Sequence, residues 1–138
     1  MIDFFSETAF SLQNPDEIAR WISKIINAQK REEGEISYIF CDDQYLHKLN
    51  LEFLNHDTLT DIISFDNSLG NQINGDIFIS IERVKENADT YKTNFEDELH
   101  RVIIHGVLHY CGFNDKTKAE ATLMRKKEDE ALSQRVFC

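Results

Sequence analysis

The order of β-prone and helical segments constrains the fold of this chain more than any other feature of the sequence. Alternating side chains predict a strand over residues 35–41, and two further β-prone runs cover 60–65 and 75–80. Residues 1–6 are a candidate for a fourth strand, and a turn or loop is expected over 67–74. Helical patterns lie between and after these runs. The sequence therefore predicts an α/β or α+β layer fold, with one small mixed sheet of about four strands covered by about five helices.

The predicted helices are marked by their N-terminal caps. Asn14-Pro15-Asp16-Glu17 combines proline at the first helical position with a capping box closed by Glu17. Capping boxes at 93–96 and 117–120 open two helices in the C-terminal third, and Asp42 can cap a short helix. A further helix is expected over 81–90. The first helix has an apolar stripe that should face the core: Ile18, Trp21, Ile22, Ile25 and Ile26.

The composition excludes several classes of protein. The 138 residues predict one domain over 1–138, which is long enough to bury a core without disulfides. The net charge of −10 excludes a uniformly basic nucleic-acid binder, although local basic sites are compatible with it. No apolar run reaches the roughly 18 to 20 residues of a membrane span, and the first residues lack the features of a signal peptide. Because the cysteines Cys41, Cys111 and Cys138 are odd in number and widely spaced, we expect a soluble protein of a reducing compartment, the cytoplasm.

Two histidines and an aspartate have the spacing of a metal site. His105 and His109 lie one turn apart in the helix that is expected to begin near Thr93, so both imidazoles can reach one ion. Gly112 can end this helix in a left-handed conformation, which would bring Asp115 back towards the same ion. Two histidines and one carboxylate leave a position open for water, as catalytic zinc requires.

The spacing alone leaves other interpretations of these residues open. A histidine pair four residues apart also arises by chance, and Asp115 can instead cap the last helix near Thr117. Cys111 is either a further ligand or a small core residue. Gly106, directly after His105, excludes a zinc peptidase of the HExxH type, which needs a glutamate there as general base.

The other polar candidates have ordinary structural explanations. His100 has no partner pattern, and we expect it to be solvated on a polar flank of its helix. Ser64 and Asp76 can face a cleft but are equally suited to turns. The basic run 125–127 lies beside the acidic run 128–130, and both are expected to form a solvated helix face.

The segment from His105 to Asp115 resembles the signature of the YbeY family, HGxLHxxGYDH. Two other stretches resemble family motifs in the same order: residues 60–65 are similar to TDVLSF, and residues 75–80 to GDIxIS. Leu49-Asn50 resembles the start of the family segment LNxxYRxKD. Together these stretches span nearly half of the chain, which is identified on this resemblance as a member of the family.

The resemblance implies a single YbeY-like metallohydrolase domain, a metal-dependent endoribonuclease that prefers single strands. Such an enzyme takes part in small-subunit (16S) rRNA maturation and ribosome quality control. It would hold one zinc ion, or a similar divalent ion, through His105, His109 and Asp115, with a water in the open position as the nucleophile. Asp115 stands where the family has its third histidine. The implied partners are ribosomal RNA and the small ribosomal subunit, with no membrane and no DNA.

The sequence departs from the family where the family carries an arginine and a lysine. Leu54 stands at the position of the arginine and His56 at that of the lysine. Leucine cannot donate a hydrogen bond, and a charge-assisted donor to a phosphate contributes roughly 1.5 to 3 kcal/mol. Ser64, His56 and Arg101 are the remaining candidates for substrate binding.

Two other functions are compatible with the same residues. The leucine at position 54 and the net charge of −10 suit a ribosome-associated assembly factor with a mainly structural metal site and little or no catalysis. A metal hydrolase that acts on another phosphoester or on an amide is the third hypothesis.

Overall fold

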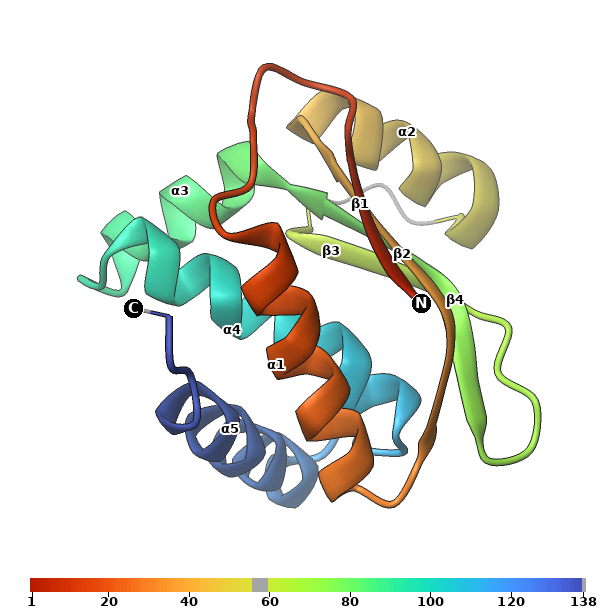
Figure 1. The fold of residues 1–138 in the computed structure, drawn as a ribbon. Helices are drawn as coiled ribbons and strands as arrows, with labels where there is room; N and C mark the ends of the chain where they lie inside the picture. Colours follow the sequence, from red (N-terminus) through yellow and green to blue (C-terminus); the bar gives the residue numbers. More distant parts are fainter. Residues whose placement is uncertain (56–59, 138) are drawn as a thin grey trace.

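A mixed sheet with helices on both faces forms the framework of the protein, for which a computed structural model describes residues 1–55 and 60–137 (Figure 1). The strands have the spatial order β1-β2-β4-β3; β1, β2 and β4 are parallel, and β3 is antiparallel to β4. The strands are β1 (Ile2–Ser6), β2 (Glu32–Cys41), β3 (Ile62–Asp66) and β4 (Gln72–Ser80). The helices are α1 (Pro15–Ala28), α2 (Asp43–Leu54), α3 (Ile81–Thr90), α4 (Phe95–Tyr110) and α5 (Lys118–Ser133). This arrangement confirms the predicted fold class.

The two faces of the sheet carry unequal hydrophobic cores. On the larger face, α4 packs on β3 and β4 and is flanked by α1, α3 and α5 (Figure 1). The predicted stripe of α1 is buried there, and the Trp21 Nε1 donates a hydrogen bond to the Ala131 carbonyl oxygen of α5 at 2.8 Å. On the other face, α2 covers a small cluster that contains Cys41, Leu46 and Ile63. Within the described residues, no helix combines the length and the apolar character needed to cross a membrane.

A glycine allows α4 to lie directly on the sheet. A Cβ atom at Gly106 would come within 3.0 Å of the Ile77 Cδ1 and 3.2 Å of the Ile62 Cδ1, so a larger residue would push the helix away. One turn further on, the Tyr110 hydroxyl lies within hydrogen-bond distance of the carbonyl oxygens of Phe65 and Asp76. These contacts fix the height and the rotation of α4 over β3 and β4.

The helix starts were predicted with mixed success. Thr117 forms the predicted capping box with Glu120, and Asp42 caps α2 by accepting a hydrogen bond from the Tyr45 backbone N–H at 2.8 Å. The box at Thr93 was wrong by one residue, because Asn94 is the cap of α4 and its side chain accepts from the Asp97 N–H. The box at Asn14 was also wrong. Asn14 adopts a left-handed conformation with φ of 56° and makes no side-chain cap, so the chain enters α1 through Pro15 alone.

The prediction that His100 is solvated was wrong. The side chain is only 5% exposed and packs against the rings of Trp21 and Phe137. Arg135 Nη1 donates to the His100 Nδ1 at 2.7 Å, which requires that nitrogen to be unprotonated. Burial and the charge of Arg135 lower the pKa of His100 from 6.5 to about 4.

This depressed pKa predicts a loss of stability in mild acid. Unfolded His100 takes up a proton near pH 6.5 and the folded form only near pH 4, so its contribution is complete above pH 6.5 and is lost as the pH falls to about 4. The contribution is at most about 3 kcal/mol. Asp61 and Glu98, whose pKa values burial raises, act in the opposite sense. We therefore expect urea unfolding at pH 7.5 and pH 4.5 to show a smaller pH dependence for His100→Gln than for the unmodified protein. An identical pH dependence in both would contradict the assignment.

Candidate active site

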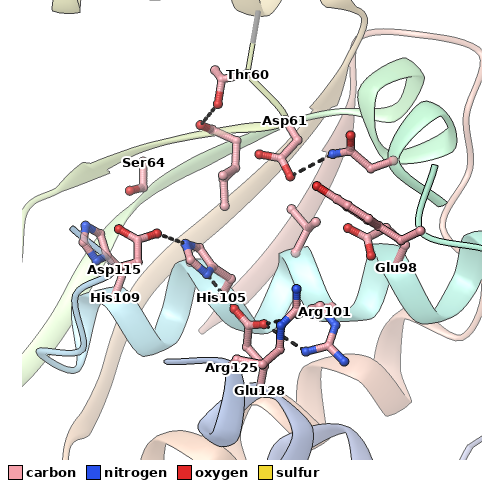
Figure 2. Close-up of a pocket in the computed structure, with 15 residues that line it drawn as sticks. Thr60, Asp61, Ser64, Glu98, Arg101, His105, His109, Asp115, Arg125 and Glu128 are labelled. Carbon is pink, nitrogen blue, oxygen red and sulfur yellow. Dashed lines mark hydrogen bonds and ion pairs between the residues drawn. The ribbon is translucent and has the colours of Figure 1, made fainter. Parts of the chain in front are cut away.

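A pocket of about 460 Å³ lies between one face of α4, the start of β3, the end of α3 and the middle of α5 (Figure 2). Residues spaced along a single face of α4 form its floor, and further residues come from the elements around it. Its polar lining residues are Thr60, Asp61, Ser64, Asn87, Tyr91, Glu98, Arg101, His105, His109, Asp115, Arg125 and Glu128. The pocket therefore brings together the three predicted metal ligands and two of the three predicted substrate-binding residues.

The two histidines present parallel rings to the pocket. Their ring centroids are 6.3 Å apart with an interplanar angle of 15°, as expected for neighbours one turn apart on a helix. The His109 Nδ1 lies 2.9 Å from the Phe113 carbonyl oxygen, which can only accept, so Nδ1 carries the proton. The Nε2 lone pair of neutral His109 is consequently available to a ligand.

Asp115 returns to the histidines because the chain reverses at the end of α4. Gly112 has φ of 106°, a conformation that favours glycine, and the chain then turns so that the Asp115 Oδ2 lies 3.3 Å from the His105 Nε2. The last helix is capped by Thr117, so Asp115 does not have the capping role that the sequence left open. The predicted proximity of Asp115 to the histidine pair is thus present in the fold.

Glu128 of α5 holds the other nitrogen of His105, a contact that sequence analysis missed. The Glu128 Oε2 lies 2.7 Å from the His105 Nδ1, while Oε1 accepts from Arg101 Nη1 at 2.9 Å (Figure 2). Glu128 is only 6% exposed, so the expectation of a solvated face over 128–130 was wrong at this position. Burial lowers the pKa of His105, but the hydrogen bond and the charges of Glu128, Asp115 and Asp61 outweigh it and raise the pKa.

The cations of the pocket differ from those predicted. The Arg101 guanidinium lines the pocket, but its two Nη atoms are engaged by Glu128 and by Asp129, the latter at 2.7 Å. Arg125 also lines the pocket and is 59% exposed, so it presents a cation that the interpretation of 125–127 as a solvated face did not identify. His56 lies outside the described residues. Leu54 ends α2 and is 43% exposed.

Of the remaining candidates, only Ser64 lines the pocket, and Asp76 and Cys111 lie elsewhere in the described structure. Ser64 lines the pocket from β3. Asp76 is exposed on β4 and is not among the lining residues of the pocket. Cys111 packs against the core beyond the end of α4, and burial raises the pKa of its thiol to about 11, which suits the small core residue rather than the further ligand.

The donor set of the pocket fits a divalent cation. Two imidazole nitrogens and one carboxylate are suitable ligands for zinc, and each histidine has its second nitrogen held by an oxygen, the usual arrangement of ligating histidines. The Asp115 carboxylate contacts His105 directly. Within residues 1–55 and 60–137, no three His, Cys, Asp or Glu side chains are already gathered around one point, so binding would require Asp115 to move off His105.

Comparison with known proteins places this site in a family. A family model described as Endoribonuclease YbeY matches residues 4–135. The Endoribonuclease YbeY of Flavobacterium johnsoniae is 59% identical over 133 residues, which cover 96% of this chain and 96% of that protein. The protein of the same name from Cytophaga hutchinsonii is 50% identical, over 99% of this chain and 96% of its own. A solution structure of TM1509 from Thermotoga maritima is similar with a TM-score of 0.67 and 25% identity, covering 97% of this chain and 91% of that one.

The chain has a mixed sheet that supports a histidine-bearing helix beside a polar pocket, and its relatives bear the name Endoribonuclease YbeY. Together these findings define the class of the protein as a small α/β endoribonuclease. Within that class, the chain belongs to the YbeY family. The family is metal-dependent, and its members act on RNA. The resemblance found in the sequence motifs is therefore confirmed over nearly the whole chain.

Proposed function

We propose that this protein cuts single-stranded RNA in the pocket beside α4, with His105, His109 and Asp115 as the ligands of one zinc ion. The observation that supports this most is the arrangement of hydrogen bonds behind the two histidines. The Phe113 carbonyl and the Glu128 carboxylate hold the Nδ1 atoms, so the His109 Nε2 is left for a ligand, and the His105 Nε2 becomes available once Asp115 moves off it. A divalent ion bound there would polarise a phosphoryl oxygen and lower the pKa of a water molecule.

The other pocket residues bind and orient the substrate in this proposal. The exposed Arg125 guanidinium is suited to hold a phosphate, since its one carboxylate partner in the described residues, Glu128, is 4.0 Å away, whereas Arg101 has two closer carboxylate partners. Ser64 can donate a hydrogen bond to a neighbouring phosphate oxygen from the β3 side. A pocket of this size accepts a single splayed strand better than a duplex, which favours single-stranded RNA.

We further propose that the substrate is ribosomal RNA of the small subunit, encountered in the cytoplasm. Family membership supports the RNA substrate, and the net charge of −10 suits a protein with a small RNA footprint that meets its substrate on the ribosome. The free thiols of Cys41 and Cys111 support a reducing compartment.

Metal stoichiometry tests the ligand set directly. We expect elemental mass spectrometry to find one zinc per chain in freshly purified protein and a marked loss in Asp115→Ala. Asp115 is 46% exposed, and its only ion pair within residues 1–55 and 60–137 is with His105, so the free energy of unfolding of the variant should lie within about 1 kcal/mol of that of the unmodified protein. Asp76→Ala, a substitution of an exposed aspartate outside the pocket, is the matched control and should keep the metal. Equal metal content in Asp115→Ala and the control would remove Asp115 from the ligand set.

A further inference from the structure

The pocket has a second end that the proposed metal site does not use. Asp61 and Glu98 lie on the side away from His109 and Asp115 (Figure 2). Asn87 and Tyr91, near the end of α3, line the same pocket, and Asn87 Nδ2 donates to the Asp61 Oδ2 at 3.4 Å. Two carboxylates, one amide and one aromatic ring therefore line a region next to the histidines.

Glu98 is the residue of this region that most requires an explanation. It is only 7% exposed, yet among residues 1–55 and 60–137 its carboxylate makes no hydrogen bond or ion pair. Burial and the charge of Asp61 raise its pKa, while Arg101 and Arg125 act in the opposite direction without contacting it. No buried side-chain oxygen of the described residues lacks a partner, so the Glu98 carboxylate is open to the pocket, where a ligand can supply the donors that the protein does not.

Asp61 offers further acceptor capacity beside Glu98. Within the described residues, its side chain accepts from its own backbone N–H and, at 3.4 Å, from Asn87, which leaves lone pairs of the carboxylate free. Burial raises its pKa as well. Both carboxylates therefore favour a ligand that presents N–H donors.

Tyr91 supplies an aromatic surface for the same ligand. Tyr91 lines the pocket and is 63% exposed, so its side chain is accessible to a ligand. Unpaired RNA bases are held in proteins by stacking on such rings and by hydrogen bonds to their Watson–Crick edges. A planar ligand with N–H donors along one edge would match both features of this region.

We propose that Asp61, Glu98 and Tyr91 form a nucleobase subsite that prefers guanine. Guanine presents the N1–H and the N2 amino group side by side, so one carboxylate can accept both, whereas adenine and cytosine offer a single amino group. Glu98 and His105 are seven residues apart on one face of α4, about 10 Å, which a nucleotide can span with its phosphate at the histidines. The subsite rests on the proposed function, since it would select the nucleotide next to the cleaved bond.

Nucleotide binding tests the subsite without requiring cleavage. We expect calorimetry or NMR titration to show guanosine monophosphate binding about tenfold or more tightly than adenosine monophosphate. Inosine monophosphate, which lacks the exocyclic amino group, should bind more weakly than the guanosine nucleotide. In Glu98→Gln the preference for guanine should be lost, and the adenosine nucleotide should bind relatively more tightly, because an amide side chain pairs with adenine through one donor and one acceptor. Glu96→Gln, at an exposed position on the first turn of the same helix, should keep the preference for guanine.

Cleavage then links the subsite to the enzyme. Oligouridines that contain a single G, A or C should be cut fastest beside G, and Glu98→Gln should abolish that bias while cutting continues. Binding without discrimination between bases, or an unchanged preference in Glu98→Gln, would overturn the subsite even if RNA is cut. Loss of Mn²⁺ binding in Glu98→Gln without any effect on nucleotides would also overturn it, in favour of a cation site. If guanine binds selectively but no RNA is cleaved, the proposed function fails and the subsite stands.

Discussion

Replacing His109 by alanine is expected to abolish cleavage of single-stranded RNA while the fold remains intact. His109 is exposed at the end of α4, and its hydrogen bond to the Phe113 carbonyl is its only contact of that kind in the described chain. Losing that bond should change the free energy of unfolding by about 1 kcal/mol or less. The imidazole supplies one of two nitrogen donors, so activity should fall by more than the 10- to 100-fold typical of residues that only support a ligand.

End-labelled RNA and urea unfolding give the two measurements. Glu96→Ala provides a matched control, since it changes an exposed residue on the first turn of the same helix and should cut RNA at the unmodified rate. Unchanged cleavage in His109→Ala would refute the assignment of the active site. If His109→Ala loses activity and its free energy of unfolding is also lower by several kcal/mol, the test should be repeated with His109→Gln, which preserves side-chain volume better.

Replacing Glu128 by glutamine should reduce zinc affinity and RNA cleavage by about 10- to 100-fold, although Glu128 touches neither ion nor substrate in the proposed site. Its carboxylate holds the Nδ1 of His105 at 2.7 Å and thereby directs Nε2 into the pocket. Glutamine keeps the size of the side chain but can present its NH₂ group instead of an acceptor, so both nitrogens of His105 become free to exchange the proton. Alanine would be a poor choice, because it leaves the partly buried Arg101 with one partner fewer and costs stability.

Asp129→Asn is the control for Glu128→Gln, because Asp129 is the other partner of Arg101 but is 59% exposed. We expect it to change activity little and stability by about 1 kcal/mol or less. A nitrogen-correlated NMR spectrum separates orientation from general damage. At a pH high enough for His105 to be neutral, it should show a single tautomer of His105 in the unmodified protein and in Asp129→Asn, and a mixture in Glu128→Gln. Full metal affinity together with a mixed tautomer would show that the contact does not matter for binding.

The parts of the site that lie close together in the sequence were predictable. His105 and His109 are one helical turn apart, and Gly112 and Asp115 follow within six residues of His109, so local geometry alone brings them near each other. The four strands and five helices were likewise predicted from alternation, periodicity and caps, with errors of a few residues at the ends of several elements. Cap positions were less certain because Thr93 and Asn94 are adjacent residues that can both accept the hydrogen bond, and packing decided for Asn94.

The contacts between helices were not predictable in the same way. Glu128 reaches His105 across 23 residues, through the packing of α5 on α4, and its acidic neighbours made it resemble a surface residue. A signal was nevertheless present, since Met124, Glu128 and Ala131 fall on one face of α5 and all three are buried. His100 similarly shares a face of α4 with buried Ile103 and Ile104. Polar residues on an apolar stripe are thus the ones to examine first.

One face of α4 packs in the core and another lines the pocket, and this arrangement determines how the enzyme loses activity on heating. Most of its residues are buried, and it contacts the sheet and three other helices. Segments of this kind open only in the global unfolding event, and their amide protons exchange with solvent slowest. His105, which lies within this helix, is therefore not released by a local, reversible opening, so thermal inactivation and cooperative melting should occur over the same range of temperature.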